Sequence, residues 1–389
     1  MKGSLVKRGN AYSIILNVRD PETGKRKQQW IAAGTNGKKA QLQLNDLLYQ
    51  LEHGTYVPPN KLTVRNHVET WLKDYVAANL SPRTAELYRY ICNRHILPRL
   101  GNIRLSDLNP VLIQNLYADK LKEGLSNRTV QILHNVLHKC LGNAIKLGLL
   151  YRNPLDSVER PKVSRTEMHT LSEADIHLIL DKAQGNEYYP TFYTILFTGM
   201  RRGEVLALKW GDINLDLLKI SVNKSLTYIR SNPKDERLVF KTPKTARSRR
   251  YISLTPSNAA VLREYRDSQN VLRQTRQLPP LDDSDLVFSN TLGRPYLPDS
   301  VTHAWVKLTR QCGLPGRRLH DCRHTYATLL LKKNVHPSIV AAQLGHASVS
   351  TTLDIYSHSV PQLQEMAAIK FDDIVMGKEN QSVSKSLAD

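Results

Sequence analysis

The chain has 389 residues, and its 55 Lys and Arg against 35 Asp and Glu give a formal net charge of +20 at pH 7. At about 150 residues per domain the length predicts two or three domains, and the basic excess favours a polyanionic partner, most commonly nucleic acid. No apolar run reaches the roughly 18 residues of a membrane span, and the N-terminal residues lack the apolar core of a secretory signal, so we expect no membrane association.

Residues 1–57 predict a small unit of three strands and one helix. Alternating apolar residues and a DPETG turn predict paired strands, and leucines at helical spacing then predict a helix that Gly54 ends. Residues 1–60 carry nine Lys or Arg against four acids. We therefore expect this unit to bind DNA on its own.

Residues 61–158 predict a compact bundle of four helices. Thr63, Ser81 and Asn109 each precede a helical pattern, and a proline follows the last two of them, as it does in a first helical turn. Apolar residues at helical spacing mark the fourth helix. Residues 159–170, which are polar and aperiodic, predict a linker to the next domain.

Residues 171–375 predict a second, larger domain that is mainly helical. Strand patterns occur only over residues 218–254, where LKISVNKSLTYI and RRYISL predict two strands that a basic segment separates. Residues 376–389 are polar and predict a flexible tail.

The four cysteines are scattered and form no Cys-x-x-Cys pair; they are Cys92, Cys140, Cys312 and Cys322. Three of them lie among apolar helical residues, as is typical of reduced, buried thiols in a cytoplasmic protein. We therefore expect neither a disulfide framework nor a zinc ribbon.

Two stretches of the larger domain offer cations to an anion. TGMRRGEVLALKW (residues 198–210) predicts an amphipathic helix whose Val205, Leu206 and Leu208 face inward. Arg201 lies at its N-terminus, where backbone N–H groups and the helix dipole favour negative charge. Taken alone, two surface arginines at a helix start are the simpler interpretation. FKTPKTARSRRYISL (residues 240–254) predicts a basic hairpin, which is either a solvated edge protected by charge or a surface that lies on DNA.

Residues 320–324 read HDCRH, which is compatible with a zinc site, a helix core or a phosphate clamp. Zinc needs about four ligands, of which His320 and His324 supply two, while Cys322 falls on another face of the helix. A buried histidine alone does not account for Arg323 one turn later, because an unpaired buried guanidinium is costly. A phosphate clamp accounts for His320 and Arg323, and His324, about 100° around the helix from Arg323, need not face the site.

The fourth stretch, QLGHASVSTTLDIYSH, places His346 after a helix end and Tyr356 ten residues later. In their order and distances, TGMRRGE, the basic hairpin, H-x-x-R, LGH and this tyrosine resemble the tyrosine recombinase (phage integrase) family. The resemblance covers nearly the whole chain and implies a multidomain α+β fold. Its expected parts are a β-β-β-α arm-type DNA-binding domain, an all-α core-binding domain, and a mainly α catalytic domain with a small antiparallel sheet.

The resemblance also implies roles for individual residues. The expected catalytic residues are Arg201, Lys244, His320, Arg323, His346 and Tyr356, and the supporting acid is Glu204. Three alternatives stay open, namely Arg202 for Arg201, Lys241 for Lys244, and Tyr326 for Tyr356. The residues expected to contact DNA are Arg128, Lys241, Arg247, Arg249 and Arg250.

The implied activity is site-specific recombination through a 3′-phosphotyrosyl intermediate, which integrates and excises a mobile element without a cofactor or a metal ion. The implied partners are double-stranded attachment-site DNA, three further copies of the chain, and an excisionase or a DNA-bending host factor. The implied location is the bacterial cytoplasm, on DNA. Two alternative functions are a type IB topoisomerase-like relaxation enzyme and a non-catalytic DNA-binding regulator.

Overall fold

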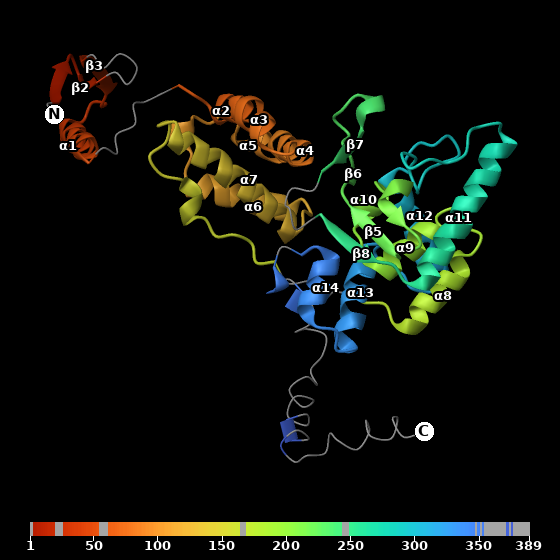
Figure 1. Ribbon diagram of the computed structural model, residues 1–389. Helices are drawn as coiled ribbons and strands as arrows, with labels where there is room; N and C mark the ends of the chain where they lie inside the picture. Colours follow the sequence, from red (N-terminus) through yellow and green to blue (C-terminus); the bar gives the residue numbers. More distant parts are fainter. Residues whose placement is uncertain are drawn as a thin grey trace. The chain divides into compact units, whose positions relative to one another are not determined.

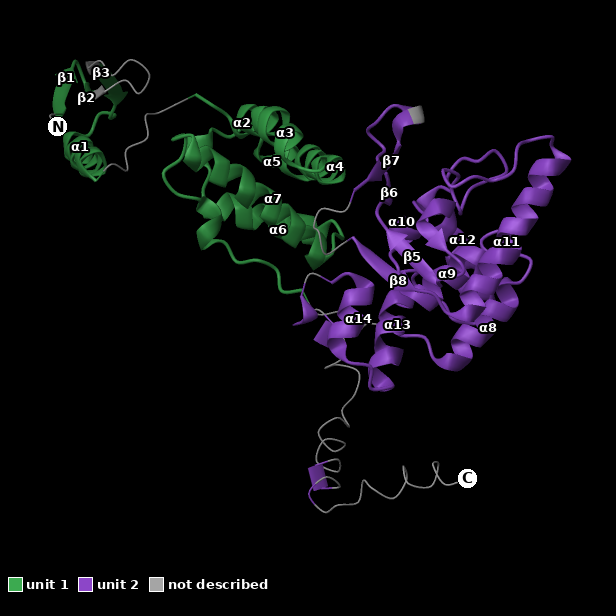
Figure 2. Ribbon diagram, viewed as in Figure 1, with its two compact units in different colours: residues 1–165 green, residues 166–389 purple. Residues whose placement is uncertain are grey.

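The fold is known from a computed structural model, shown in Figure 1. The residues that it describes are 3–19, 26–53, 61–163, 169–242, 249–346, 348–350, 352–353, 371–372 and 375. The chain divides into two compact units, residues 1–165 and 166–389 (Figure 2). No helix within the described ranges is long and apolar enough to cross a membrane.

The first unit begins with the predicted arrangement of three strands and a helix. Its elements are β1 (Gly3–Arg8), β2 (Ala11–Arg19), β3 (Arg26–Ala32) and α1 (Gly37–Glu52). The strands form an antiparallel sheet in chain order, and Leu44 of α1 shares a buried cluster with Ile14 and Leu16 of β2. Alternation along β2 thus turns one face of the sheet toward the helix. The DPETG turn and Gly54 lie outside the described residues.

The rest of the first unit is an all-helical bundle. Its helices are α2 (Val64–Trp71), α3 (Ala77–Asn79), α4 (Pro82–Ile91), α5 (Leu97–Leu100), α6 (Pro110–Lys122) and α7 (Asn127–Lys146). A π-helical turn joins α2 to α3 and another joins α4 to α5, so each of these pairs is one continuous helix. The side chains of Thr63, Ser81 and Asn109 each accept a hydrogen bond from the first turn that they precede, which confirms the predicted helix starts.

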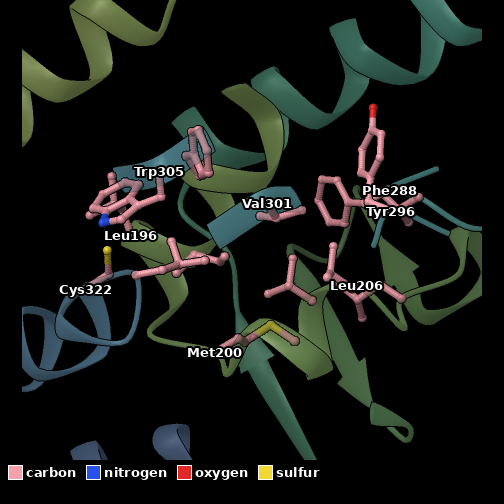
Figure 3. Packing of buried hydrophobic residues seen from close by; sticks show 14 of the residues in the cluster. Leu196, Met200, Leu206, Phe288, Tyr296, Val301, Trp305 and Cys322 are labelled. Atoms are coloured by element: carbon pink, nitrogen blue, oxygen red, sulfur yellow. The ribbon is translucent and has the colours of Figure 1, made fainter. Parts of the chain in front are cut away.

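The second unit contains seven α-helices within the residues described. They are α8 (Glu173–Ala183), α9 (Tyr189–Thr198), α10 (Arg202–Val205), α11 (Pro256–Thr275), α12 (Pro298–Gln311), α13 (Asp321–Lys332) and α14 (Pro337–Leu344). Figure 3 shows the main core, in which Leu196, Met200, Trp305 and Cys322 are buried. A second, smaller cluster joins α13 to α14 through residues such as Leu331. The mainly helical prediction is therefore confirmed.

The strands of the second unit differ from the prediction in their pairing. They are β4 (Ile213–Asn214), β5 (Lys219–Val222), β6 (Ser225–Tyr228), β7 (Leu238–Lys241) and β8 (Arg250–Ser253). One sheet has the order β4-β5-β8 and the other pairs β6 with β7. The predicted long strand breaks between β5 and β6, where the Asn223 side-chain amide donates to the Asp212 carboxylate at 3.2 Å and to the Ser221 hydroxyl at 2.8 Å. The predicted basic hairpin is wrong, because β7 and β8 belong to different sheets.

The helix predicted after Arg201 is also shorter than expected. Val205, Leu206 and Leu208 are buried as predicted, but α10 ends at Val205. The chain then leaves the helix because the Val287 N–H donates to the Leu208 carbonyl, which forms part of a short bridge between two extended segments. All four cysteines are free thiols; Cys92, Cys140 and Cys322 are buried and Cys312 is half-buried.

A glycine at the end of α9 allows three helices to meet. Gly199 adopts a left-handed conformation with φ of 62°, and a Cβ atom there would lie 2.7 Å from side-chain atoms of both Tyr326 in α13 and Leu344 in α14. Only a residue without a side chain meets both requirements without strain. Gly199 therefore fixes how closely α9, α13 and α14 approach.

We predict that Gly199→Ala destabilises the second unit more than Gly313→Ala does. Gly313 has a similar φ of 72°, but a Cβ atom there would meet no heavy atom within 4 Å, so its substitution carries only the left-handed backbone cost of about 1–2 kcal/mol. Gly199→Ala adds an overpacking cost of about 1–3 kcal/mol. Urea denaturation measures the loss of stability in each variant, and hydrogen exchange in α9 and α14 shows whether these helices are affected. Equal losses for the two variants would contradict the close packing.

Candidate functional site

Three segments that are distant in sequence meet at the N-terminal end of α13. Arg201 precedes α10, Arg323 lies in the first turn of α13, and His346 follows α14. Arg323 joins the three segments, since its Nη1 donates to the Gly199 carbonyl at 2.9 Å and its Nη2 donates to the Leu344 carbonyl at 2.7 Å. The fold thus brings together Arg201 and Arg323, the two arginines that were expected to bind phosphate.

Arg323 is a buried cation with 3% of its surface exposed. Burial, together with the nearby charge of Arg201, lowers the pKa of Arg323 to about 9, so the guanidinium stays charged at neutral pH. A guanidinium has five N–H donors, and two of them hold backbone carbonyls here. Arg323 is therefore rigidly held and can bind an anion in addition.

Arg201 is more accessible and is oriented by a buried acid. Its side chain is 42% exposed, its Nη1 donates to Glu204 Oε1 at 2.8 Å, and its backbone N–H donates to Glu204 Oε2 at 3.0 Å. Burial raises the pKa of Glu204, but hydrogen bonds and charge from Arg250 and Arg201 outweigh it, so the net pKa lies below the ordinary value. The carboxylate is ionised at neutral pH and holds Arg201 beside Arg323.

The two expected site histidines are neutral near pH 7. Burial and the charges of His324 and Arg323 lower the pKa of His320, which directly precedes α13. Burial and the charges of Arg323 and Arg201 lower the pKa of His346 to about 4, and its Nδ1 lies 2.8 Å from Thr352 Oγ1. A neutral imidazole can accept or donate a proton, so both rings are suited to proton transfer or hydrogen bonding.

His324 is closer to the site than we expected. Its ring lies edge-on to that of His320, with 5.0 Å between the ring centroids, and its buried Nδ1 has no hydrogen-bond partner in the described part of the chain. His324 lies beside His320 because residues four apart on a helix are neighbours. Within the described ranges, no three His, Cys, Asp or Glu side chains are grouped to hold a metal ion.

Two alternative residues have contacts elsewhere. The Arg202 guanidinium donates to the Pro298 carbonyl at 2.7 Å and to Thr302, both at the start of α12. The Tyr326 hydroxyl donates to the Gln343 amide oxygen at 2.7 Å, and burial raises the pKa of Tyr326. These contacts favour Arg201 over Arg202 and disfavour Tyr326 as an accessible nucleophile.

The remaining expected residues fall into three groups. Lys244, Arg247 and Tyr356 lie outside the described residues. Lys241 ends β7, where it pairs with Ser225, and Arg249 is exposed just before β8. Arg128 is exposed near the start of α7, where it bonds Gln131.

Arg250 does not have the position expected of a DNA contact. Its side chain is 6% exposed and forms an ion pair of 2.9 Å with Glu204. Its Nε also donates to the Gln343 carbonyl. The run of basic residues gives no sign of which member is buried, although Arg250 alternates with the buried Ile252 and Leu254.

Comparisons with known proteins identify the family of the chain. Residues 169–362 match the phage integrase family, and residues 63–122 match the N-terminal SAM-like domain of phage integrases. The chain is 27% identical to a XerC-like tyrosine recombinase of Caldanaerobacter subterraneus subsp. tengcongensis, over 96% of this chain and 99% of that protein. It is 30% identical to the ICEBs1 integrase of Bacillus subtilis, over 76% of this chain and 78% of that protein.

Solved structures show the same fold. The integrase of the Tn1549 transposon, in complex with transposon right end DNA, matches with a TM-score of 0.68 and 18% identity, over 81% of this chain and all of that one. A lambda integrase tetramer bound to a Holliday junction matches with a TM-score of 0.58 and 17% identity, over 90% and 94% of the chains. The expected multidomain α+β architecture is confirmed. The chain therefore belongs to the phage integrase family of tyrosine recombinases, and it is an enzyme that breaks and rejoins DNA at specific sites.

Proposed function

We propose that Arg201, His320, Arg323 and His346 bind one DNA phosphodiester and that Tyr356 attacks it. The observation that supports this assignment is the meeting of Arg201, Arg323 and His346 from three separate segments around one buried, charged guanidinium. A single phosphodiester would satisfy the cationic donors that converge there. The proposal rests on geometry for the first four residues and on sequence position for Tyr356.

The two arginines stabilise charge that grows during the reaction. Attack on a phosphodiester builds negative charge on the non-bridging oxygens, and fixed donors lower the barrier most because they need no reorganisation. Arg323 is fixed by burial, whereas the exposed face of Arg201 can receive the DNA. Planar guanidinium groups match pairs of phosphate oxygens better than a lysine does.

Proton transfer is divided among the remaining residues. A tyrosine hydroxyl has an ordinary pKa near 10, so Tyr356 needs a proton acceptor or nearby cations, and neutral His320 is suited to accept the proton. The Tyr356 oxygen bonds to phosphorus while the bond from phosphorus to the 5′ oxygen breaks. The leaving 5′ oxygen takes a proton, for which we propose Lys244, with Lys241 as its alternative.

The covalent product explains why no energy source is needed. A 3′-phosphotyrosyl bond keeps the energy of the broken phosphodiester, and the 5′-hydroxyl of another strand can attack it and release the tyrosine. Exchange between strands of two sites then gives integration or excision of a mobile element. Since four strands are exchanged, we propose that four copies of the chain assemble on double-stranded attachment sites in the bacterial cytoplasm, with an excisionase or a DNA-bending host factor as an accessory.

Different domains bind different parts of the DNA. We assign residues 1–57 to arm-type sites, 61–158 to core sites, 159–170 to the linker, 171–375 to catalysis and 376–389 to a tail. Exposed Trp30 of β3, with the Arg8 guanidinium 4.8 Å from its ring, gives the first of these a cationic and aromatic surface of the kind that nucleic acids bind. Arg128, Arg247 and Arg249 are our candidates for backbone contacts to the core site.

We predict that Tyr356→Phe binds core-site DNA normally and forms no covalent adduct. The substitution removes only the attacking oxygen. The measurement uses nicked DNA that traps the intermediate, with adducts resolved on a denaturing gel. Tyr326→Phe is the matched control and keeps adduct formation, since the Tyr326 hydroxyl contacts Gln343. Adducts formed by Tyr356→Phe would contradict the assignment of the nucleophile.

We predict that deletion of residues 1–57 removes one class of protected DNA sites and leaves cleavage of the core site intact. The physical reason is that this segment has its own buried cluster and its own excess of basic residues. Footprinting of the full and shortened proteins checks the loss. An isolated fragment of residues 1–60 whose DNA affinity did not fall with rising salt would count against an electrostatic arm contact.

A further inference from the structure

Arg250 links two parts of the site that are otherwise separate. It lies in β8, where it pairs with Val222 of β5, and its guanidinium reaches both Glu204 and the last turn of α14. We infer that Arg250 is a positioning residue for DNA cleavage, which holds Arg201 through Glu204 and holds His346 through the end of α14. This inference rests on the proposed function for what Arg201 and His346 do.

The contact with Glu204 fixes the acid that orients Arg201. Arg250 Nη2 donates to Glu204 Oε2 at 2.9 Å and Nη1 donates to Oε1 at 3.3 Å, so the two groups meet as a parallel fork. Glu204 is 5% exposed, and a buried carboxylate that loses one of two cationic partners is strongly destabilised. Without Arg250, the carboxylate would draw Arg201 inward or take up a proton, and either change moves Arg201 from its position.

The contact with α14 fixes the segment that carries His346. The last carbonyls of α14 accept hydrogen bonds from three arginines in turn: Gln343 from Arg250 at 2.5 Å, Leu344 from Arg323 at 2.7 Å, and Gly345 from Arg201 at 3.4 Å. The C-terminal end of a helix carries partial negative charge, which these cations complement. Arg250 thus binds the first carbonyl of the turn that leads into His346.

The packing against Gly345 makes this contact specific. Gly345 is left-handed with φ of 68°, and a Cβ atom there would lie 2.9 Å from Arg250 Nη1. The guanidinium therefore lies directly against the backbone that turns toward His346. A lysine at position 250 would supply one point charge, and it could not bind Glu204 with a fork and Gln343 with Nε at once.

The test compares Arg250→Lys, Arg250→Gln, Glu204→Gln and the double variant in the full chain. We measure the single-turnover rate of adduct formation at saturating nicked DNA, the DNA affinity and the melting temperature. Arg263→Gln is the matched control, because Arg263 also bonds a backbone carbonyl, that of Leu215, and an acid, Asp216, but contacts none of the site residues named above.

The inference predicts that Arg250→Lys binds DNA within about twofold of the wild type and forms adducts at least about tenfold more slowly, since small misplacements of catalytic groups cost this much or more. Arg263→Gln keeps the wild-type rate. A wild-type rate for Arg250→Lys would overturn the inference. A loss of affinity that accounts for the whole loss of rate would also overturn it, because Arg250 would then be a DNA contact.

The double variant, Glu204→Gln with Arg250→Gln, separates the contact of Arg250 with Glu204 from its contact with α14. It also replaces Arg250→Gln as a test if that single variant does not fold. Removing both charges leaves no unpaired carboxylate, so Glu204→Gln with Arg250→Gln tests the α14 contact alone. The inference predicts that the double variant is slower than Glu204→Gln. Equal rates would overturn the role of Arg250 at α14.

Hydrogen exchange gives a reading that does not depend on catalysis. Arg250→Lys is expected to speed exchange at the His346 amide, which bonds the Ala341 carbonyl in the capping turn of α14. If the wild type formed no adduct, the proposed function would fail, while faster exchange would still support the positioning of α14. Unchanged exchange would overturn it.

Discussion

The arrangement of the site depends on the burial of one positive charge, that of Arg323. Removing a guanidinium from water costs several kcal/mol unless oxygen atoms surround it. Here the oxygens come from the ends of α9 and α14, at Gly199 and Leu344. The need to satisfy Arg323 therefore draws two helix ends to the start of α13, and the left-handed glycines at both ends let the carbonyls approach.

The same charge sets the electrostatics around it. Arg201, Arg250 and Arg323 lie close together with Glu204 as their common acid, so positive charge is in excess. Burial, together with this excess, keeps His346 and His320 neutral, and the excess leaves the site in need of an anion. In the proposed function, a DNA phosphodiester supplies that anion. Stability without DNA and affinity for DNA are thus opposed, since the binding of phosphate relieves repulsion among the arginines.

Local sequence rules gave the helix starts correctly, because a cap such as Thr63 is bonded within its own first turn. They failed at residues whose partners are distant in sequence. The pairing of β7 and β8 with different strands, for example, cannot be read from their own residues. Strand pairing is a tertiary property, and propensity alone does not fix it.

The order of the motifs predicted the candidate site, but it did not show where Arg250 and His324 lie. Arg250 alternates with Ile252 and Leu254, which puts it on the buried face of β8, and the basic run obscured this signal. His324 is four residues from His320, a spacing that places the two rings side by side. Strand alternation for Arg250 and helical spacing for His324 indicate these two positions from the sequence. What the sequence lacked was the identity of the partners, Glu204 and the end of α14.

The central claim is that Arg201 stabilises the charge of the cleaved phosphate. The most direct measurement compares cleavage of ordinary DNA with cleavage of DNA that carries a neutral methylphosphonate at the cleavage site. The account predicts that Arg201→Ala lowers the cleavage rate about 100-fold on ordinary DNA. On neutral DNA it predicts a loss of only about tenfold, because there is less charge to stabilise. Arg202→Ala removes a side chain that contacts Pro298, and it changes the cleavage rate little on either DNA. An equal loss for Arg201→Ala on both DNAs would contradict the account.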